Sequence, residues 1–170
     1  MITLKCTRKL LDLLGGVTIE EAPPPTSALG DWYATVTATV AGELIVFANE
    51  RTLLSVALPM AMVDALVPAF AARVYNLLVT IGVPEDMARR GSDELREIEF
   101  AKTSSRSVLG SLNQIVLHYQ LKAERSLGSS PPVLSEAEVA LSRTLHGPLD
   151  YVYPAEIAKQ LLAKRYGQAD

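Results

Sequence analysis

The chain has 170 residues, of which 49% are hydrophobic and 21% charged, and its formal net charge is −3. This length and apolar content predict one globular domain with room for a small appendage. The net negative charge argues against a nucleic-acid polycation, and aromatic residues, at 6%, are too sparse for a base-stacking platform. A single cysteine, Cys6, cannot form an internal disulfide, and without CxxC or paired histidines we expect no metal site.

The start of the chain and its longest apolar stretch indicate where in the cell the protein is located. Charged side chains at Lys5, Arg8 and Lys9 come too early for the apolar region of a signal peptide. Charges and prolines interrupt the apolar stretch from Leu53 to Val83, so it is not typical of a membrane span. We therefore expect a cytoplasmic protein that does not contact a membrane.

The first half of the chain changes from strand to helix and back to strand. Residues 2–6 predict a short strand, and residues 8–14 predict a helix that ends at a glycine pair. After a proline-rich stretch, residues 32–40 alternate apolar and polar side chains, as in a half-buried strand. Two more strands, at residues 43–48 and 52–58, follow across short turns, so we expect a three-stranded antiparallel meander.

The second half of the chain is mainly helical. We expect helices at residues 60–81, 84–90 and 104–125, and a strand at residues 97–101. Pro68 is expected to break or kink the first of these helices, because proline removes a backbone donor. Gly91 and Ser92 predict a loop after the short charged helix.

The tail of the chain is set apart by its composition. Residues 127–132 are rich in glycine, serine and proline, which predicts a linker. The sequence Ser135-Glu136-Ala137-Glu138 has the spacing of a capping box and predicts a helix start, and residues 155–166 predict a last helix. We therefore divide the chain into an α+β domain at 1–126, a linker, and a helical C-terminal extension at 133–170.

These elements together predict an α+β fold. The expected core is an antiparallel sheet of four or five strands, packed on one face by the two long helices. The C-terminal helical pair is expected to pack alongside this unit or to mediate self-association into a homo-oligomer.

Polar residues gather where the strand at 97–101 meets the second long helix. The cations Lys102 and Arg106 and the hydroxyls of Thr103 and Ser104 lie where a helix N-terminus points outward, and this geometry suits an anion. Arg106 can hold a phosphate or carboxylate through two parallel hydrogen bonds. The spacing is not that of a P-loop, and we expect no cofactor.

Further polar residues are expected at the same edge of the sheet. At 100° per residue, Arg106, Gly110 and Asn113 share one helix face, where a glycine admits a close approach and Asn113 can hold a sugar or amide. Asn49 and Arg51 lie in a turn between two strands, and such a turn commonly meets a helix start at one sheet edge. We therefore include both residues in the candidate ligand site.

Simpler interpretations of these residues stay open. Thr103 or Ser104 can be an ordinary N-cap, with Arg106 a solvated or ion-paired cation and Gly110 a helix–helix contact. Cys6, before a helix start, can have thiolate character or can be a small buried apolar residue.

Several segments resemble a bacterial family of uncharacterised small domains, catalogued as a domain of unknown function. They are Leu4-Lys5-Cys6-Thr7-Arg8-Lys9-Leu10-Leu11, Leu29-Gly30-Asp31-Trp32-Tyr33-Ala34, Phe47-Ala48-Asn49-Glu50-Arg51-Thr52-Leu53, and Lys102-Thr103 with Arg106-Ser107-Val108-Leu109-Gly110-Ser111. Some members of that family resemble, or are joined to, plasmid-borne Orf3-like proteins. The resemblance covers about residues 1–125. It implies a bacterial setting and no catalytic residue.

The sequence therefore favours a non-catalytic binding or regulatory module, with an anionic ligand or a protein partner at the helix start near Lys102 and Arg106. Two alternatives remain: an enzyme acting on a phosphorylated substrate, and a nucleic-acid accessory protein of a mobile element. Strongly salt-dependent nucleic-acid binding favours the latter, and a deep pocket with a shifted pKa favours the enzyme.

Overall fold

The structure is a computed structural model that describes the chain except residues 126–133, 145, 147–151 and 168–170. Its strands are β1 (Ile2–Cys6), β2 (Trp32–Thr39), β3 (Gly42–Asn49), β4 (Ser55–Pro59) and β5 (Ile98–Lys102). Its helices are α1 (Arg8–Leu14), η1 (Met60–Ala65), α2 (Leu66–Thr80), α3 (Glu85–Asp93), η2 (Glu94–Arg96), α4 (Arg106–Arg125), α5 (Leu134–Ser142) and α6 (Pro154–Tyr166). The expected α+β class is confirmed.

The five strands form one sheet in the order β4-β3-β2-β1-β5. The predicted meander is confirmed, because β2 pairs antiparallel with β3 and β3 pairs antiparallel with β4. Strand β1, however, runs parallel to both β2 and β5. The sheet is therefore mixed and not wholly antiparallel, because helical crossovers, which parallel pairs require, separate these strands in sequence.

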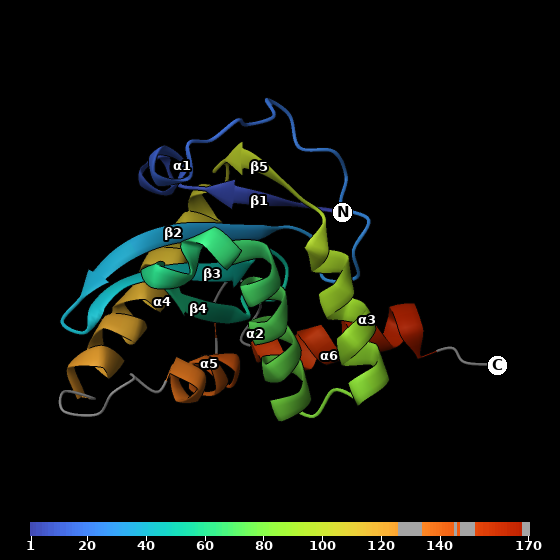
Figure 1. The fold of residues 1–170 in the computed structure, drawn as a ribbon. Helices are drawn as coiled ribbons and strands as arrows, with labels where there is room; N and C mark the ends of the chain where they lie inside the picture. The colour runs from blue at the N-terminus through green and yellow to red at the C-terminus, as the bar shows by residue number, and fades with distance from the viewer. Residues whose placement is uncertain (126–133, 145, 147–151, 168–170) are drawn as a thin grey trace.

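Helices cover both faces of this sheet (Figure 1). Helices α1, α2, α3 and α6 bury apolar side chains against one face, and α4 and α5 against the other. The two long helices, α2 and α4, therefore lie on opposite faces, whereas the sequence predicted them on one face. The reason is that β3 and β4 place buried apolar side chains on both faces, so each face needs its own cover.

Aromatic packing anchors the larger core. The Trp32 and Phe70 rings meet edge to face with centroids 5.1 Å apart, and Phe47 stacks on Phe70 at 4.4 Å. All three side chains are fully buried, which fixes α2 against the start of β2 and the end of β3.

Two features of helix α2 relate to the sequence predictions: the position of Pro68 and the apolar character of the segment. Pro68 lies in its first turn, where a proline removes no intrahelical bond, and residues 60–65 before it form a 3₁₀ helix. By length and composition the segment Met60–Thr80 could cross a membrane, with a mean hydropathy of 1.4. In this fold Phe70, Val74 and Leu78 of α2 are instead buried against the sheet.

The predicted loop at Gly91 and Ser92 is instead the last turn of α3. Both residues are buried, and a Cβ atom at Gly91 would lie 2.8 Å from the Leu162 Cδ2 atom. The glycine therefore allows α6 to approach α3 closely, a packing role that local sequence does not reveal.

The predicted linker at 127–132 lies outside the described residues. The helix after it begins at Leu134, and the Glu138 carboxylate is buried beside Arg73, although the capping-box spacing predicted it at the helix start. Leu134 and Leu141 of α5 belong to the smaller core, and Leu162 of α6 belongs to the larger one.

Candidate functional site

The chain leaves the sheet in opposite directions after two neighbouring strands. After β1 it enters α1, whose Leu10 and Leu11 pack on the face that carries α2. After β5 it enters α4, whose Leu112 and Ile115 pack on the other face. Strands β1 and β5 are adjacent and parallel, so this divergence is a topological switch point, the place where open α/β sheets hold their ligands.

A crevice of about 740 Å³ lies at this switch point. It is lined by segments that follow both strands, including Arg8, Asp12, Gly16, Thr18, Lys102 and Thr103. Two cations and two hydroxyls thus face a shared space together with one carboxylate. Such a set can neutralise an anion while Asp12 accepts a hydrogen bond from a hydroxyl or ammonium group of the same ligand.

The predicted site residues near α4 separate into two groups. Lys102 and Thr103 line the crevice. The Tyr33 hydroxyl lies 3.3 Å from the Ser104 hydroxyl and accepts a hydrogen bond from the Ser105 backbone N–H at 3.0 Å. These contacts fix the start of α4 to β2, so Ser104 serves the local structure.

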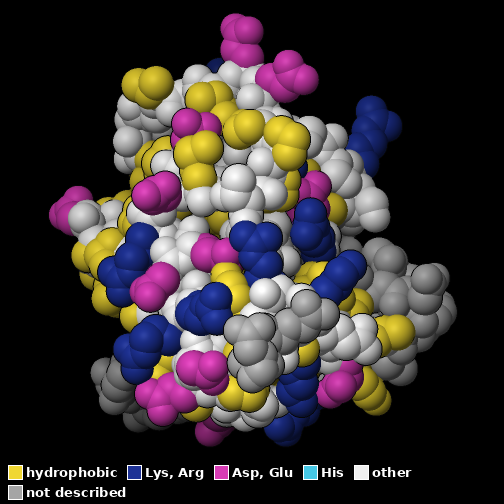
Figure 2. Space-filling view, turned by 90° about the vertical axis from the view of Figure 1, so that its right-hand side faces the viewer, with side chains coloured by type: hydrophobic (Ala, Val, Ile, Leu, Met, Phe, Trp, Pro, Cys, Tyr) yellow, Lys and Arg dark blue, Asp and Glu magenta, His cyan; other side chains and the backbone are white. Residues whose placement is uncertain are grey.

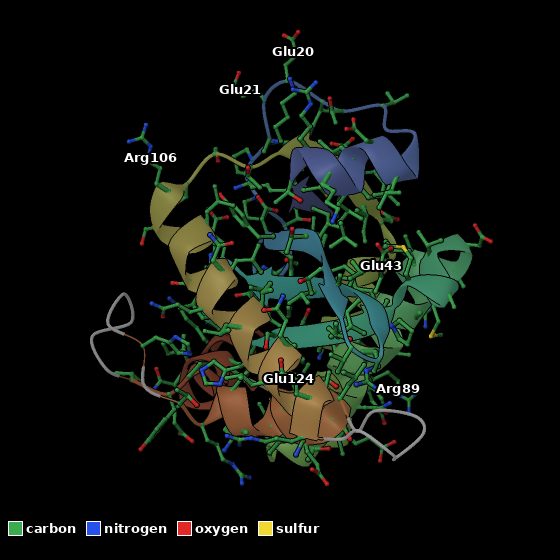
Figure 3. All side chains as sticks on the ribbon, turned by 90° about the vertical axis from the view of Figure 1, so that its left-hand side faces the viewer. Glu20, Glu21, Glu43, Arg89, Arg106 and Glu124 are labelled. Carbon is green, nitrogen blue, oxygen red and sulfur yellow. The ribbon has the colours of Figure 1, made fainter. Side chains whose placement is uncertain are left out.

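Ser105 is the residue that caps α4. Its hydroxyl accepts a hydrogen bond from the Val108 backbone N–H at 3.3 Å, which satisfies one donor of the first turn. Arg106 is exposed and lies outside the crevice lining, and its side chain points away from the body of the molecule (Figure 3). On the same helix, Asn113 and Gly110 are exposed, and nothing lies within 4 Å of a Cβ atom at Gly110.

Asn49 lies level with the middle of β1 and β5, because its partner Trp32 pairs with Leu4, which pairs with Phe100. Asn49 pairs with Trp32 at the start of β2, and strands β2 and β1 separate it from β5. Its amide nitrogen donates to the carbonyls of Leu29 and Asp31, and its oxygen accepts from the backbone N–H groups of residues 51 and 52. With 0% exposure, Asn49 ties two loops together and presents no polar atom to a ligand.

Arg51 lines a different cavity, of about 510 Å³, together with Lys164 and Arg165. Its guanidinium packs against Gly30, where a Cβ atom would lie 2.9 Å from the Arg51 Nε atom. On the face that carries α3 and α6, basic and acidic side chains are interspersed (Figure 2). The structure therefore does not bring Asn49 and Arg51 to Lys102.

Of the two interpretations of Cys6, a reactive thiolate or a small buried apolar residue, the structure supports the second. The Cys6 side chain is fully buried in the larger core, and its Sγ atom lies 3.6 Å from the Leu4 carbonyl. Burial raises the pKa of the Cys6 thiol to about 12, so it stays protonated at neutral pH.

Sequence reasoning missed the part of the crevice lining that follows β1, including the charged residues Arg8 and Asp12. The available signal was a cation directly after each parallel strand, Arg8 shortly after β1 and Lys102 at the end of β5. That signal has meaning only when β1 and β5 are known to be parallel neighbours, since parallel strands end at the same edge of a sheet.

A family model of domains of unknown function matches residues 3–157. The chain belongs to the family described as Domain of unknown function (DUF6933). The match to DUF6933 reaches beyond residue 125 and includes α5, and it shows no link to Orf3-like proteins. No curated protein and no solved structure matches the chain.

Proposed function

We propose that this domain is a binding or regulatory module that holds a small organic anion in the crevice between α1 and the end of β5. The observation that carries the proposal is that β1 and β5, adjacent and parallel, each deliver a cation, Arg8 and Lys102, to the lining of one crevice at the switch point. The segments that follow β1 and β5 turn to opposite faces of the sheet, and this separation leaves room for a ligand at the sheet edge.

The chemistry of the lining narrows the ligand class. Arg8 can pair with a phosphate or carboxylate through two hydrogen bonds, and Lys102 adds a point charge. Asp12 would repel a simple anion but would accept a hydrogen bond from a neighbouring hydroxyl. We therefore favour a phosphorylated or carboxylated metabolite that carries a free hydroxyl.

The test is calorimetric titration with inorganic phosphate and with glycerol 3-phosphate, which adds two hydroxyls to the same anion. We expect tighter binding of glycerol 3-phosphate, and a loss of about tenfold or more in affinity for both probes in Lys102→Ala and Arg8→Ala. Asp12→Asn is expected to reduce the preference for the hydroxylated probe.

Arg106→Ala is the matched control, because Arg106 is a cation at the same end of the molecule but outside the crevice. We expect this variant to bind as the unmodified protein does. An equal loss in Arg106→Ala and Lys102→Ala would contradict the crevice and support a diffuse charge effect. No heat from either probe would also refute the proposal.

A further inference from the structure

A second cavity, remote from the switch point, lies between α2 and α5. Its volume is about 600 Å³, within the range of small-molecule sites. Its lining includes Arg73, Asn76, Leu77, Glu138, Val139 and Arg143. Helices α2 and α5 lie side by side next to the edge strand β4 (Figure 1).

The cavity contains a charge pair whose acidic member, Glu138, is buried. An Arg73 Nη2 atom donates to the Glu138 Oε1 atom, and the Glu138 side chain is 3% exposed against 30% for Arg73. Arg73 is the only charged residue of α2. Replacing such a pair with apolar residues is often neutral or stabilising, so its presence calls for another reason.

Polar atoms of this pair are left unsatisfied. The Arg73 Nε and Glu138 Oε2 atoms are buried and have no hydrogen-bond partner of good geometry among the described residues, although the Ala57 backbone N–H faces the Glu138 carboxylate. Native proteins rarely leave such atoms unpaired, so each exception calls for an explanation, such as a functional role or a bound water or ion. The pair is therefore incompletely satisfied as it stands.

The rest of the lining indicates which ligand would fit. Arg143 is exposed and adds a second guanidinium to the cavity, while Leu77 and Val139 give it an apolar wall. The other acidic residue of the lining, Glu136, is held by Lys122 at 2.7 Å. A singly charged anion with an apolar body matches this surface better than phosphate, whose second charge Glu138 would oppose.

We propose that the cavity between α2 and α5 binds a small organic monocarboxylate, whose carboxylate pairs with Arg73 and Arg143 and whose apolar body packs on Leu77 and Val139. In this site Glu138 acts as an internal competitor, because its own carboxylate occupies Arg73. A proton on Glu138 weakens that contact and makes Arg73 available to the ligand.

Burial supports such a competition, since it raises the pKa of Glu138 from 4.5 to about 7 against the opposing charge of Arg73. The groups that face Glu138 are Arg73 from α2, the fully buried Tyr119 from α4, and the Ala57 backbone N–H from β4. Affinity for the carboxylate therefore rises as pH falls from 8 to 6.

The experiment is calorimetric titration of the full chain with hexanoate at pH 6 and pH 8, with hexanol as the uncharged counterpart. Hexanoate is expected to bind at least fivefold more tightly at pH 6, and hexanol to bind far more weakly at both pH values. Arg143→Ala is expected to lower the affinity for hexanoate at least tenfold. Because Arg143 is exposed, this change should leave the fold intact.

Glu138→Gln removes the competing charge while keeping the shape of the side chain. We expect it to bind hexanoate at pH 8 as tightly as the unmodified protein does at pH 6, with no further gain at pH 6. Arg89→Ala, which removes an exposed arginine of α3 that is paired with Glu85, is the control and is expected to change nothing.

Three results would overturn the proposal: no binding of hexanoate at either pH, equal binding of hexanol, or unchanged hexanoate affinity in Arg143→Ala. If the hexanoate affinity of Glu138→Gln depends on pH as that of the unmodified protein does, Glu138 does not compete with the ligand for Arg73. Lys102→Ala, in the crevice at the switch point, should leave hexanoate binding unaltered, so the two proposed sites can fail separately.

Discussion

Glu138→Gln should flatten the dependence of stability on pH. In the native state, burial raises the pKa of Glu138 from 4.5 to about 7. The folded protein therefore holds this proton more tightly than the unfolded chain does. The stabilisation is fully present below about pH 4.5 and is lost as pH rises through about 7.

The size of the effect follows from the same two pKa values. One pKa unit corresponds to about 1.4 kcal/mol, so ionising Glu138 in the folded state costs about 3 kcal/mol relative to the unfolded chain. The side chain is 3% exposed, so solvent screens this cost little. Arg73 lies beside Glu138 and offsets the burial only in part, as the raised pKa shows.

The assay is urea denaturation of the unmodified protein and of Glu138→Gln at pH 5 and pH 8. The loss of unfolding free energy between these two pH values should be smaller in the variant by about 2–3 kcal/mol. Comparing the two losses cancels the contribution of every other titrating group to the pH dependence. One such group is His146, because burial lowers its pKa.

Glu136→Gln is the matched control, because Glu136 lies two residues away on the same helix but is exposed. A surface ion pair contributes about 0–1 kcal/mol, so this variant should keep the pH dependence of the unmodified protein. If Glu138→Gln also keeps that dependence, burial does not raise the pKa of Glu138 and this prediction is wrong.

Three further predictions concern the core and the tail. Cys6 should resist iodoacetamide at pH 8 until urea unfolds the protein, because its raised pKa and burial keep the thiol inert; modification in the native state would contradict this. Asn49→Ala should lower the unfolding free energy by about 2–4 kcal/mol in urea titration, because the buried backbone groups that the Asn49 amide binds lose their hydrogen-bond partners. A change of less than about 0.5 kcal/mol would contradict this prediction. Removing residues 126–170 should cost several kcal/mol, because Leu134 and Leu162 each contribute about 1.5–3 kcal/mol by burial; an unchanged urea midpoint would instead support an independent domain at 1–126.

Local patterns predicted the elements of this fold well. The alternation in residues 32–40 and the short turns after it led directly to β2, β3 and β4, because hairpin pairing is set by neighbouring residues. The glycine at position 15 ends α1 in the left-handed conformation, as its position after an amphipathic run predicts.

Pairing between distant strands could not be predicted in this way. Nothing in the local sequence places β5 beside β1, and this contact decides which residues lie next to Lys102 and Thr103. Asn49 ends β3 and Lys102 ends β5, and the strand order places β2 and β1 between them, so the two residues do not meet. Glu138 shows the same limit, since its capping-box spacing gave no sign that Arg73 lies beside it.

The most direct test of the switch-point site is an amide NMR titration of the isotopically labelled protein with glycerol 3-phosphate. The crevice predicts saturable shifts at Gly16, Thr18 and Thr103, the backbone that lines it from both sides. Shifts confined to Ser107 and Gly110, on the exposed first turns of α4, would instead assign the anion to the helix terminus and contradict the switch-point site.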